Sequence, residues 1–361
     1  MLANKVKFNP LFFPFSIFYG IGVGVRNKLF DWGILPTERF PIPVICVGNL
    51  AVGGTGKTPH TEYLVELLKD KYKVAVLSRG YKRKTKGFIL ADSSCTSEDI
   101  GDEPYQIYYK YPDIIVAVDS DRRKGIRELL SLDKDKKPDV ILLDDGFQHR
   151  YVTPSFSIIL TDYARPFYLD KLMPYGRLRE PRFATSRTDA VIMTKCNCDM
   201  KPLDYRLVEK SMRLSAHQSL FFTTIDYKEI KPVFPEEAEP WSLADIRKSD
   251  AVFAVTGVAS PKTFIKEIKR YTNNIEKLSF KDHHHFSKQD LADIENKFNK
   301  IPSLGKLIIM TEKDAARLRN NNGLPESLRK VMYYMPISIK FCTQSENEFK
   351  EMINKHVSLF C

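Results

Sequence analysis

The sequence predicts an α/β fold with a mostly parallel sheet, and three features of its 361 residues lead to that prediction. Short runs rich in Val, Ile and Leu alternate with helical stretches, as expected for parallel strands covered on both faces. A glycine-rich turn stands between the first of these runs and an amphipathic helix. A second series of runs and helices follows near residue 250. We therefore expect a large α/β lobe, a second, smaller α/β lobe and an apolar segment ahead of both.

The strands expected in the first lobe are short and continuously apolar. They span 43–47, 73–77, 114–118, 140–143, 157–160 and 190–193. A helix is expected at 58–69, where Leu64, Leu67 and Leu68 share one face. Another is expected around 125–130.

The chain loses this regular pattern after residue 195, and the stretch 196–250 contains four prolines, which suits a connection. The second series then comprises strands at 252–255, 306–310 and 337–341, a turn at 257–261 and a helix that begins at 262. The predicted divisions are 1–35 for the apolar N-terminal segment, 36–200 for the first lobe and 201–361 for the second.

The N-terminal segment is strongly apolar, since residues 11–25 contain only Ser16 and Tyr19 as polar side chains. The run is shorter than the ~20 apolar residues that cross a bilayer. A signal-peptide core is one alternative, but no small-residue cleavage site follows. A helix buried against the first lobe is another. Because basic and aromatic residues come next, as at Lys28 and Trp32, we expect a helix that docks in the membrane interface.

The formal net charge is +11 at pH 7. A basic balance suggests an acidic partner, such as a nucleic acid, an anionic membrane surface or a phosphorylated ligand. A surface rich in solvated lysine would give the same value, so the charge alone leaves these classes open. The 43% hydrophobic content is ordinary for a globular core and does not indicate disorder.

Six cysteines are scattered along the chain, and none belongs to a C-x-x-C pair. Cys196 and Cys198 lie two residues apart, but no second half of a zinc site follows them. This usage predicts reduced thiols in a cytosolic compartment.

Residues 51–58 have the sequence AVGGTGKT and stand between an expected strand and an expected helix. Glycines let the backbone turn tightly and bring its N–H groups close to phosphate oxygens. Lys57 can reach the β- and γ-phosphates of a nucleotide, and the Thr58 hydroxyl can bind magnesium. We therefore predict a P-loop for ATP and Mg²⁺ that contains Ala51, Val52, Gly53, Gly54, Thr55, Gly56, Lys57 and Thr58. Ala51 departs from the usual first glycine of this motif.

Two carboxylates, Asp144 and Asp145, follow the expected strand 140–143 and precede Gly146. Such a turn on its own is polar surface more often than a metal site. At the end of a strand beside a P-loop, however, a carboxylate orients magnesium directly or through water. We predict that Thr58, Asp144 and Asp145 hold the metal, and the sequence leaves open which carboxylate contacts it first.

Further short strings lie along the chain. They are Leu-Ser-Arg-Gly-Tyr at 77–81, Gly-Asp-Glu-Pro at 101–104, Asp-Asp-Gly-Phe-Gln-His at 144–149, Leu-Arg-Glu-Pro at 178–181, Asp-His at 282–283 and Thr-Glu-Lys-Asp-Ala at 311–315. In this order around the P-loop, they resemble the tetraacyldisaccharide 4'-kinases, the membrane-associated lipid A kinases of Gram-negative bacteria. The resemblance runs nearly end to end and is consistent with a P-loop NTPase-like sheet.

The resemblance implies that ATP phosphorylates the 4'-hydroxyl of a tetraacylated glucosamine disaccharide 1-phosphate, which yields lipid IVA and ADP. It also implies an N-terminal helix that docks on the cytosolic face of the bacterial inner membrane, peripherally or with shallow insertion. The expected partners are the acylated disaccharide lipid and the membrane surface, without a nucleic acid or a protein partner.

The resemblance also suggests roles for individual residues. Lys57 would stabilise charge on the transferred phosphoryl group. Asp102, in the Gly-Asp-Glu-Pro string, would act as the general base on the sugar hydroxyl. His283 would pair with Asp102, although His284 and His285 adjoin it and leave the register open.

Several of these residues have simpler alternatives. Asp102 could cap the helix that follows it, and consecutive histidines are common in surface loops. Arg79, Arg177 and Arg179 are candidates for binding the substrate's 1-phosphate, because guanidinium groups match phosphate oxygens. The same arginines could form surface salt bridges.

Two other functions remain open from the sequence. A P-loop kinase or ligase for a soluble metabolite is the first, although such an enzyme would have no use for the apolar run at 11–25. A nucleotide-switched membrane scaffold or a nucleic-acid binder is the second. Its basic and aromatic patch would be Tyr-Lys-Arg-Lys at 81–84.

Overall fold

The computed structural model describes residues 8–238, 241–258, 261–282, 284, 286–319, 321 and 323–360. It divides into two compact units. The first comprises Met1–Ser94, Ile107–Ile225 and Ile339–Cys361, and the second comprises Cys95–Gln106 and Asp226–Ser338.

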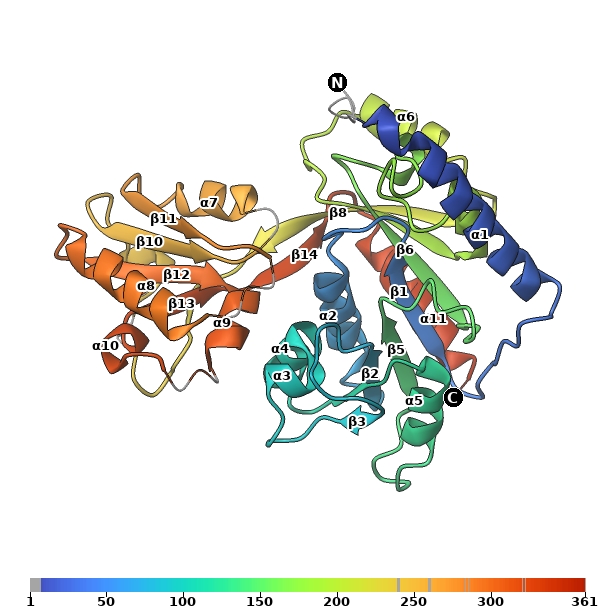
Figure 1. Ribbon diagram of the computed structural model, residues 1–361, viewed down its shortest axis with the longest axis horizontal. Helices are drawn as coiled ribbons and strands as arrows, with labels where there is room; N and C mark the ends of the chain where they lie inside the picture. The colour runs from blue at the N-terminus through green and yellow to red at the C-terminus, as the bar shows by residue number, and fades with distance from the viewer. Residues whose placement is uncertain are drawn as a thin grey trace. The chain divides into compact units, whose positions relative to one another are not determined.

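A nine-stranded sheet with the order β14-β8-β7-β6-β1-β5-β2-β4-β3 forms the centre of the first unit (Figure 1). Its strands are β1 (Val44–Asn49), β2 (Val74–Ser78), β3 (Ile89–Leu90), β4 (Ile115–Val118), β5 (Val140–Asp144), β6 (Phe156–Asp162), β7 (Ala190–Thr194), β8 (Ser219–Tyr227) and β14 (Ile337–Phe341). From β8 to β4, neighbouring strands pair in parallel, and β3 pairs antiparallel with β4. The mostly parallel sheet and its six predicted strands are confirmed, with ends within two residues of the predicted ones.

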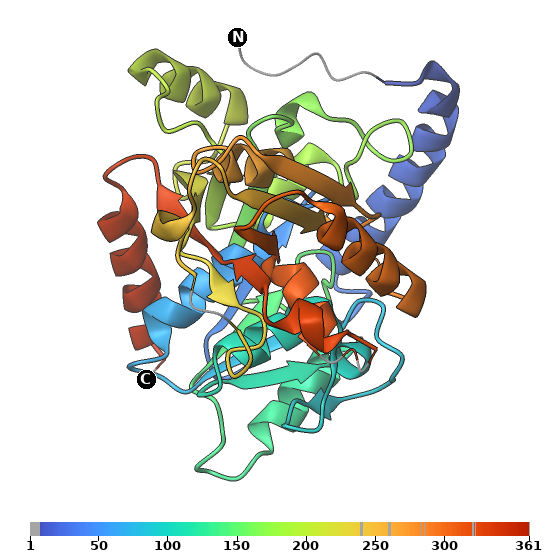
Figure 2. The same ribbon diagram turned by 90° about the vertical axis from the view of Figure 1, so that its left-hand side faces the viewer.

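Helices bury both faces of this sheet. They are α2 (Lys57–Leu68), α4 (Asp102–Lys110), α5 (Arg122–Leu130), α6 (Pro202–Met212) and α11 (Glu346–Ser358). Ile45 and Val47 of β1 belong to one core cluster with α2, α4 and α11, and Figure 2 shows α2 and α11 next to each other. Val44 and Cys46 belong to the opposite cluster, which contains side chains of α5 and α6. Because alternate residues of a strand face opposite sides, a continuous apolar strand fills both cores.

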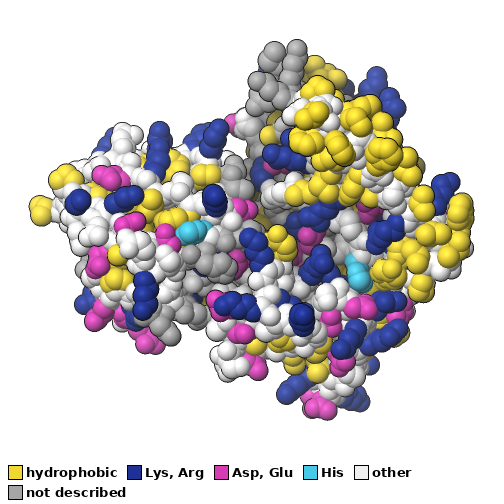
Figure 3. Space-filling model, in the orientation of Figure 1, with side chains coloured by type: hydrophobic (Ala, Val, Ile, Leu, Met, Phe, Trp, Pro, Cys, Tyr) yellow, Lys and Arg dark blue, Asp and Glu magenta, His cyan; other side chains and the backbone are white. Residues whose placement is uncertain are grey.

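The N-terminal run forms a short 3₁₀ turn, η1 (Pro10–Phe12), and a long helix, α1 (Phe13–Asp31). Ser16, Asn27 and Phe30 are the residues of α1 that are buried. Much of the rest of the helix is apolar and exposed, and Figure 3 shows hydrophobic side chains gathered over it. Across the described part of the chain, no helix is both long enough and apolar enough to cross a membrane.

A five-stranded sheet with the order β11-β10-β12-β13-β9 forms the second unit. Its strands are β9 (Lys231–Pro232), β10 (Ala251–Thr256), β11 (Ile275–Ser279), β12 (Lys306–Thr311) and β13 (Met332–Met335), and its helices are α3 (Ser97–Ile100), α7 (Lys262–Ile268), α8 (Lys288–Lys300), α9 (Glu312–Arg319) and α10 (Glu326–Arg329). Side chains of α8 and α9 cover one face of this sheet, and those of α7 cover the other.

The chain passes between the units differently from the continuous lobes predicted at 36–200 and 201–361. The strand predicted at 337–341 is β14, which lies beside β8 in the first sheet, where Cys342 N donates to Phe222 O at 2.9 Å. Residues Ile339–Cys361 therefore belong to the first unit, and Cys95–Gln106 belong to the second. The sequence pattern did not predict β8, because its polar Thr and Asp residues interrupt the apolar run.

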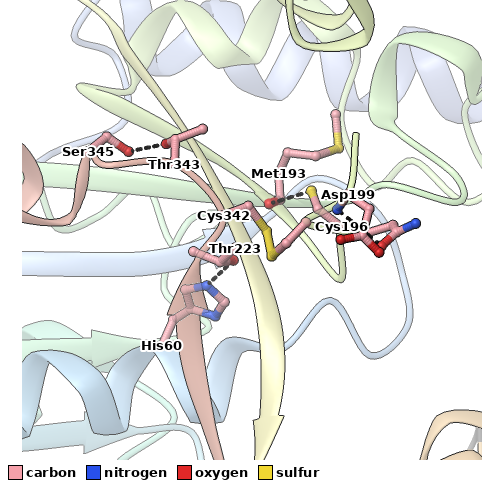
Figure 4. The surroundings of a disulfide bond; sticks show 10 residues. His60, Met193, Cys196, Asp199, Thr223, Cys342, Thr343 and Ser345 are labelled. Carbon is pink, nitrogen blue, oxygen red and sulfur yellow. Dashed lines mark hydrogen bonds between the residues drawn. A yellow bond between two sulfur atoms is a disulfide. The ribbon is translucent and has the colours of Figure 1, made fainter. Parts of the chain in front are cut away.

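A disulfide joins Cys198 to Cys342, across 144 residues of sequence, with the two Cα atoms 4.7 Å apart (Figure 4). Reduced thiols were predicted for all the cysteines, and for this pair the prediction was wrong. Spacing along the chain could not reveal the bond, because it depends on β14 returning to the edge of the sheet beside β8, near the end of β7. Cys46 and Cys196 are buried free thiols.

Two measurements test the disulfide: the number of reactive thiols and the thermal midpoint of unfolding. Reducing the unfolded protein should release two more reactive thiols than unfolding alone, measured by maleimide labelling and mass spectrometry. Cys342→Ser should lower the thermal midpoint under non-reducing conditions, because the unfolded chain then loses a cross-link that closes a long loop. The control is the same comparison under reducing conditions, where the difference in midpoint between the two proteins should largely disappear. Equal thiol counts before and after reduction would contradict the bond.

Candidate active site

The predicted P-loop and the predicted carboxylate pair lie at the same edge of the first sheet. β1 and β5 are parallel neighbours, and Val47 pairs in register with Asp144. The carboxyl ends of both strands therefore meet, with the loop after β1 on one side and Asp144-Asp145 on the other. Ligands bind at this edge in open parallel sheets.

The loop has the backbone that a phosphate site requires. Gly53 and Gly56 have φ angles of 124° and 89°, which side chains with a Cβ rarely adopt. Gly56 caps α2, and Lys57 is the first residue of that helix. The unpaired N–H groups and the positive end of α2 are therefore directed into the loop, where an anion is favoured. Thr58 follows in the first turn and is buried.

Ala51 is accommodated because it lies before the turn of the loop. It forms an antiparallel bridge with Leu178. Val52 N donates to Arg177 O at 2.8 Å, and Arg179 N donates to Leu50 O at 2.7 Å. Extended backbone accepts any residue, so a glycine is not required at the position of Ala51.

Neighbouring elements hold the loop in shape. Asn49 Nδ2 donates to Thr55 Oγ1 at 2.9 Å, and Thr194 Oγ1, at the end of β7, donates to Thr55 O at 2.8 Å. Lys195 Nζ donates to Gly54 O and, at 2.8 Å, to Asp162 Oδ2. Such contacts fix the loop before any ligand is present, which is the preorganisation that phosphate binding needs.

Asp145 lies between two cations. Lys57 Nζ is 3.7 Å from Asp145 Oδ1, and Arg179 Nη1 donates to both oxygens of Asp145 at 3.3 Å. Arg179 also donates to Gln148 Oε1 at 3.1 Å, and Gln148 Nε2 donates to Asn49 O at 2.7 Å. Arginine, carboxylate and P-loop are therefore linked in one network.

Asp144 is almost fully buried beneath this network and accepts a hydrogen bond from Thr61 Oγ1 of α2 at 3.3 Å. Arg122 is also buried and donates to the backbone carbonyl of Asp145 at 3.4 Å. Burial lowers the pKa of Arg122, whereas the charge of Asp145 opposes that change.

The donor set suits magnesium. Thr58, Asp144 and Asp145 offer hard oxygen ligands at one edge of the sheet, and magnesium takes few protein ligands while keeping waters. Within the described residues, no group of three or more His, Cys, Asp or Glu side chains could hold a metal without such help. The residues present fit a metal that is shared with phosphate oxygens and water.

Helix α1 is bonded to the loops that carry this network. Tyr19 Oη donates to Arg179 O at 2.8 Å, and Arg26 Nη2 donates to Gln148 O at 3.0 Å. Asn27 Nδ2 donates at 2.9 Å to Glu180, a buried carboxylate. The apolar helix is therefore attached directly to the candidate site.

The three predicted substrate arginines have different environments. Arg179 is engaged with Asp145 and Gln148, whereas the side chains of Arg79 and Arg177 are exposed. Arg79 follows β2 and lies near enough to Arg122 to lower the pKa of that guanidinium.

Asp102 lies in the second unit as the first residue of α4. Arg317 of α9 donates to Asp102 Oδ2 from Nε at 2.9 Å, and its Nη2 is also 2.9 Å from that oxygen. Arg317 Nη1 donates at 2.8 Å to Asp314, the aspartate of the Thr-Glu-Lys-Asp-Ala string. Asp314 in turn accepts from Gly257 N at 2.9 Å. His283 lies outside the described residues.

Arg317 was not predicted from the sequence. Its signal is its position three residues after Asp314, since residues three apart lie on the same face of a helix. Arg122 was also missed. It begins α5 shortly after β4, whereas Arg79 directly follows β2. Binding residues gather at strand ends on this edge of a parallel sheet.

Comparison with known proteins agrees with this geometry. The sequence profile of the family described as Tetraacyldisaccharide-1-P 4'-kinase matches residues 8–358. The tetraacyldisaccharide 4'-kinase of Parabacteroides distasonis is 54% identical, over 98% of this chain and 96% of that protein. The one from Flavobacterium johnsoniae is 45% identical, over 93% and 94%. This chain belongs to the tetraacyldisaccharide 4'-kinase family.

A solved structure of the same family has the same fold. The LpxK crystal structure from Aquifex aeolicus, in complex with ATP, is 31% identical to this chain, with a TM-score of 0.72. The alignment covers 95% of this chain and 98% of that one. The tetraacyldisaccharide 4'-kinase fold thus extends over both units, and the predicted P-loop NTPase-like α/β class is confirmed.

His60, in the first turns of α2, is a buried histidine with two hydrogen-bond partners. Its Nδ1 is 2.7 Å from Gly56 O and its Nε2 is 3.0 Å from Thr223 Oγ1. A carbonyl oxygen can only accept, so the neutral ring carries its proton on Nδ1, and Nε2 accepts from the Thr223 hydroxyl. Burial lowers the pKa of His60 from 6.5 to about 4, against the smaller effect of the Gly56 hydrogen bond.

Acid should therefore destabilise the folded protein through His60. The unfolded chain protonates this histidine near its ordinary pKa, whereas the folded protein holds it neutral, so stability falls as the pH drops from about 6.5 towards 4. In His60→Gln, the loss of unfolding free energy between pH 7 and pH 5 should be smaller by about 2 kcal/mol. Urea unfolding at both values measures it.

His217→Gln is the matched control, because His217 is exposed. This variant should lose as much stability between the two pH values as the wild type. His149, whose pKa burial also lowers to about 4, is present in all three proteins and cancels in the comparison. An unchanged pH dependence in His60→Gln would contradict this, because it would mean that the pKa of His60 is the same in the folded and unfolded protein.

Proposed function

We propose that this protein transfers the γ-phosphoryl group of ATP to the 4'-hydroxyl of a tetraacylated glucosamine disaccharide 1-phosphate, which gives lipid IVA. The observation that carries the proposal is the network of Lys57, Asp145 and Arg179 at the P-loop, in a chain that belongs to the tetraacyldisaccharide 4'-kinase family. Phosphoryl transfer depends mainly on positioning and charge stabilisation, which is what this network provides.

The residues at the sheet edge have separate proposed roles in binding the phosphates and the metal. The loop amides and Lys57 bind the phosphates and stabilise charge on the group being transferred. Thr58, Asp144 and Asp145 hold Mg²⁺, which supplies charge neutralisation at the phosphate oxygens when it is bound. The cations on both sides of Asp145 keep its carboxylate in place.

Asp102 is the proposed general base on the sugar hydroxyl. Contacts from Nε and Nη2 of Arg317 fix the orientation of its carboxylate, which a base needs in order to align with its proton. His283 is proposed as its partner on the basis of the family resemblance. Arg79 and Arg177, whose side chains are exposed, are proposed to bind the 1-phosphate.

The membrane surface is the proposed partner of α1, on the cytosolic side of the inner membrane. Phe15 and Phe18 are 60% and 73% exposed, which would be costly in water alone. Because α1 is bonded to the loop of Arg179, a helix lying in the interface would keep the phosphate site beside a substrate whose acyl chains stay in the bilayer. A soluble-metabolite kinase would not need this arrangement, which disfavours that alternative.

The kinase assay tests the proposed reaction. With ATP, Mg²⁺ and the acylated disaccharide 1-phosphate in detergent, the wild type should form a bis-phosphorylated lipid, followed by radiolabel transfer. Asp102→Asn should lower kcat by about 10²- to 10⁴-fold, because an amide cannot accept the hydroxyl proton. Lys57→Ala should lose nearly all turnover.

Asp113→Asn, which alters an exposed carboxylate, is the control and should keep the wild-type kcat. If Asp102 serves only as a helix cap, Asp102→Asn should retain its kcat, and Asp102→Ala should mainly lose ~1 kcal/mol of stability. That outcome would remove Asp102 from the catalytic step and leave the family assignment intact. Absence of any transfer by the folded wild type would contradict the reaction itself.

Docking by α1 is tested separately. Replacing both Phe15 and Phe18 with Ser should weaken sedimentation with phospholipid vesicles, because it removes exposed apolar area from the helix. The turnover of detergent-solubilised substrate should change little. Leu304→Ser is the control, since Leu304 is fully exposed in the second unit. Equal vesicle binding by the α1 variant and the control would exclude α1 as the docking element.

A further inference from the structure

Helix α6 and the segment 165–187 form a second surface of the first unit with unusual chemistry. On one side, this segment contacts α1, where Ser16 Oγ donates to Leu172 O at 3.0 Å and the rings of Phe13 and Tyr175 are 5.5 Å apart. On its other side it packs on α6, because Phe167 and Met212 are buried in the same core cluster. One continuous stretch of chain thus joins α1 to α6.

The surface exposes large apolar side chains. Leu203 and Leu207, one turn apart on α6, are 65% and 42% exposed, and Phe183 of η3 (Arg182–Arg187) is 66% exposed. Residues four apart on a helix share a face, so the two leucines form one apolar strip.

A cavity of about 700 Å³ opens between Phe183 and the last residues of α6. It is lined by three cations, Arg182, Lys210 and Arg213, and otherwise by Phe167, Tyr168, Phe183, Thr185, Ser211 and Met212. No carboxylate is present among these lining residues. Three cationic residues and two aromatic rings thus border one open cavity, and Arg182 also donates to Asp170 O at 3.1 Å. This combination favours an anion carried on an apolar molecule.

Arg213 also has an unusual backbone conformation. It ends α6 in the left-handed region, with a φ of 53°, where glycine or asparagine would be less strained. The need to end the helix therefore does not explain why this residue is an arginine. A side chain that contributes charge to the cavity gives a reason for this residue at a strained position.

We propose that this cavity binds the phosphate of an acidic phospholipid headgroup, while Leu203, Leu207 and Phe183 enter the membrane surface. Arg182, Lys210 and Arg213 supply the charge, and phosphate oxygens are the acceptors that guanidinium and ammonium groups prefer. The protein then contacts the membrane at two places, α1 and α6, which fixes its orientation as well as its attachment. The proposal rests on the membrane association proposed for α1.

Vesicle binding tests the headgroup site. The wild type should bind vesicles of phosphatidylcholine mixed with phosphatidylglycerol more tightly than vesicles of phosphatidylcholine alone. Replacing both Lys210 and Arg213 with Gln should weaken binding to the acidic vesicles by about 30-fold and leave binding to the neutral vesicles nearly unchanged. Leu203→Ser with Leu207→Ser should weaken binding to both kinds of vesicle.

The matched control replaces Lys136 and Lys137 with Gln, which removes the same charge from an exposed loop after α5. This variant should bind acidic vesicles like the wild type. Thermal unfolding and turnover of detergent-solubilised substrate should be unchanged in the control and in the double variant at Lys210 and Arg213. Those two measurements separate this site from the reaction.

Three results would overturn the proposal. The first is equal binding of acidic vesicles by the Lys210 and Arg213 variant and by the control. The second is an equal loss on acidic and neutral vesicles. The third is a lower thermal midpoint with the acidic preference intact, which would mean that these cations serve only the end of α6. The variant with Phe15 and Phe18 replaced tells whether α1 docks at all, independently of these outcomes.

Discussion

The candidate site depends on the parallel register of β1 and β5. Because Val47 pairs with Asp144, the chain that leaves β1 and the chain that leaves β5 turn on the same edge of the sheet. The glycines of the loop then place Lys57 at the start of α2, 3.7 Å from Asp145. A slip of this pairing by one residue would turn Asp144 to the other face of the sheet and separate the two groups. The buried apolar runs on both faces make such a slip costly, so core packing and phosphate chemistry are set by the same register.

The charge on Asp145 connects that edge to helix α1. The negative charge of Asp145 is compensated by Lys57 and Arg179. The backbone carbonyl of Arg179 accepts a hydrogen bond from Tyr19 of α1. Arg26 of the same helix holds the carbonyl of Gln148, the other partner of Arg179. Movement of α1 would therefore shift the backbone of both residues that orient the arginine. This gives a physical route by which the position of α1 affects the phosphate site, through backbone contacts and not through its apolar side chains.

Short sequence patterns predicted much of the fold and the phosphate loop, but they did not predict contacts between residues far apart in the chain. The strands around Val44–Asn49 and Val140–Asp144 are continuous apolar runs, and the loop needs glycine at Gly53 and Gly56, so both leave a mark in short stretches of sequence. The bond between Cys198 and Cys342 leaves no such mark, since its partners are 144 residues apart. The strand β8 was not predicted, because its polar residues interrupt the apolar pattern that marks the other strands. At Ala51 the sequence departs from the usual first glycine of the P-loop. The structure explains this, because the backbone of Ala51 is extended and does not require glycine.

The Thr-Glu-Lys-Asp-Ala string illustrates how a short motif can act at a distance from the chemistry. Asp314 is fully buried, and burial raises its pKa while Arg317, the N–H of Gly257 and the Thr311 hydroxyl act in the opposite direction. A buried carboxylate with that many donors is a fixed point in the second unit. Arg317, held by it, also donates to Asp102, so β12 and α9 contribute to the orientation of the proposed base. The sequence indicated Asp102 and the string as separate signals, and in the structure Arg317 contacts both Asp102 and Asp314 of the string.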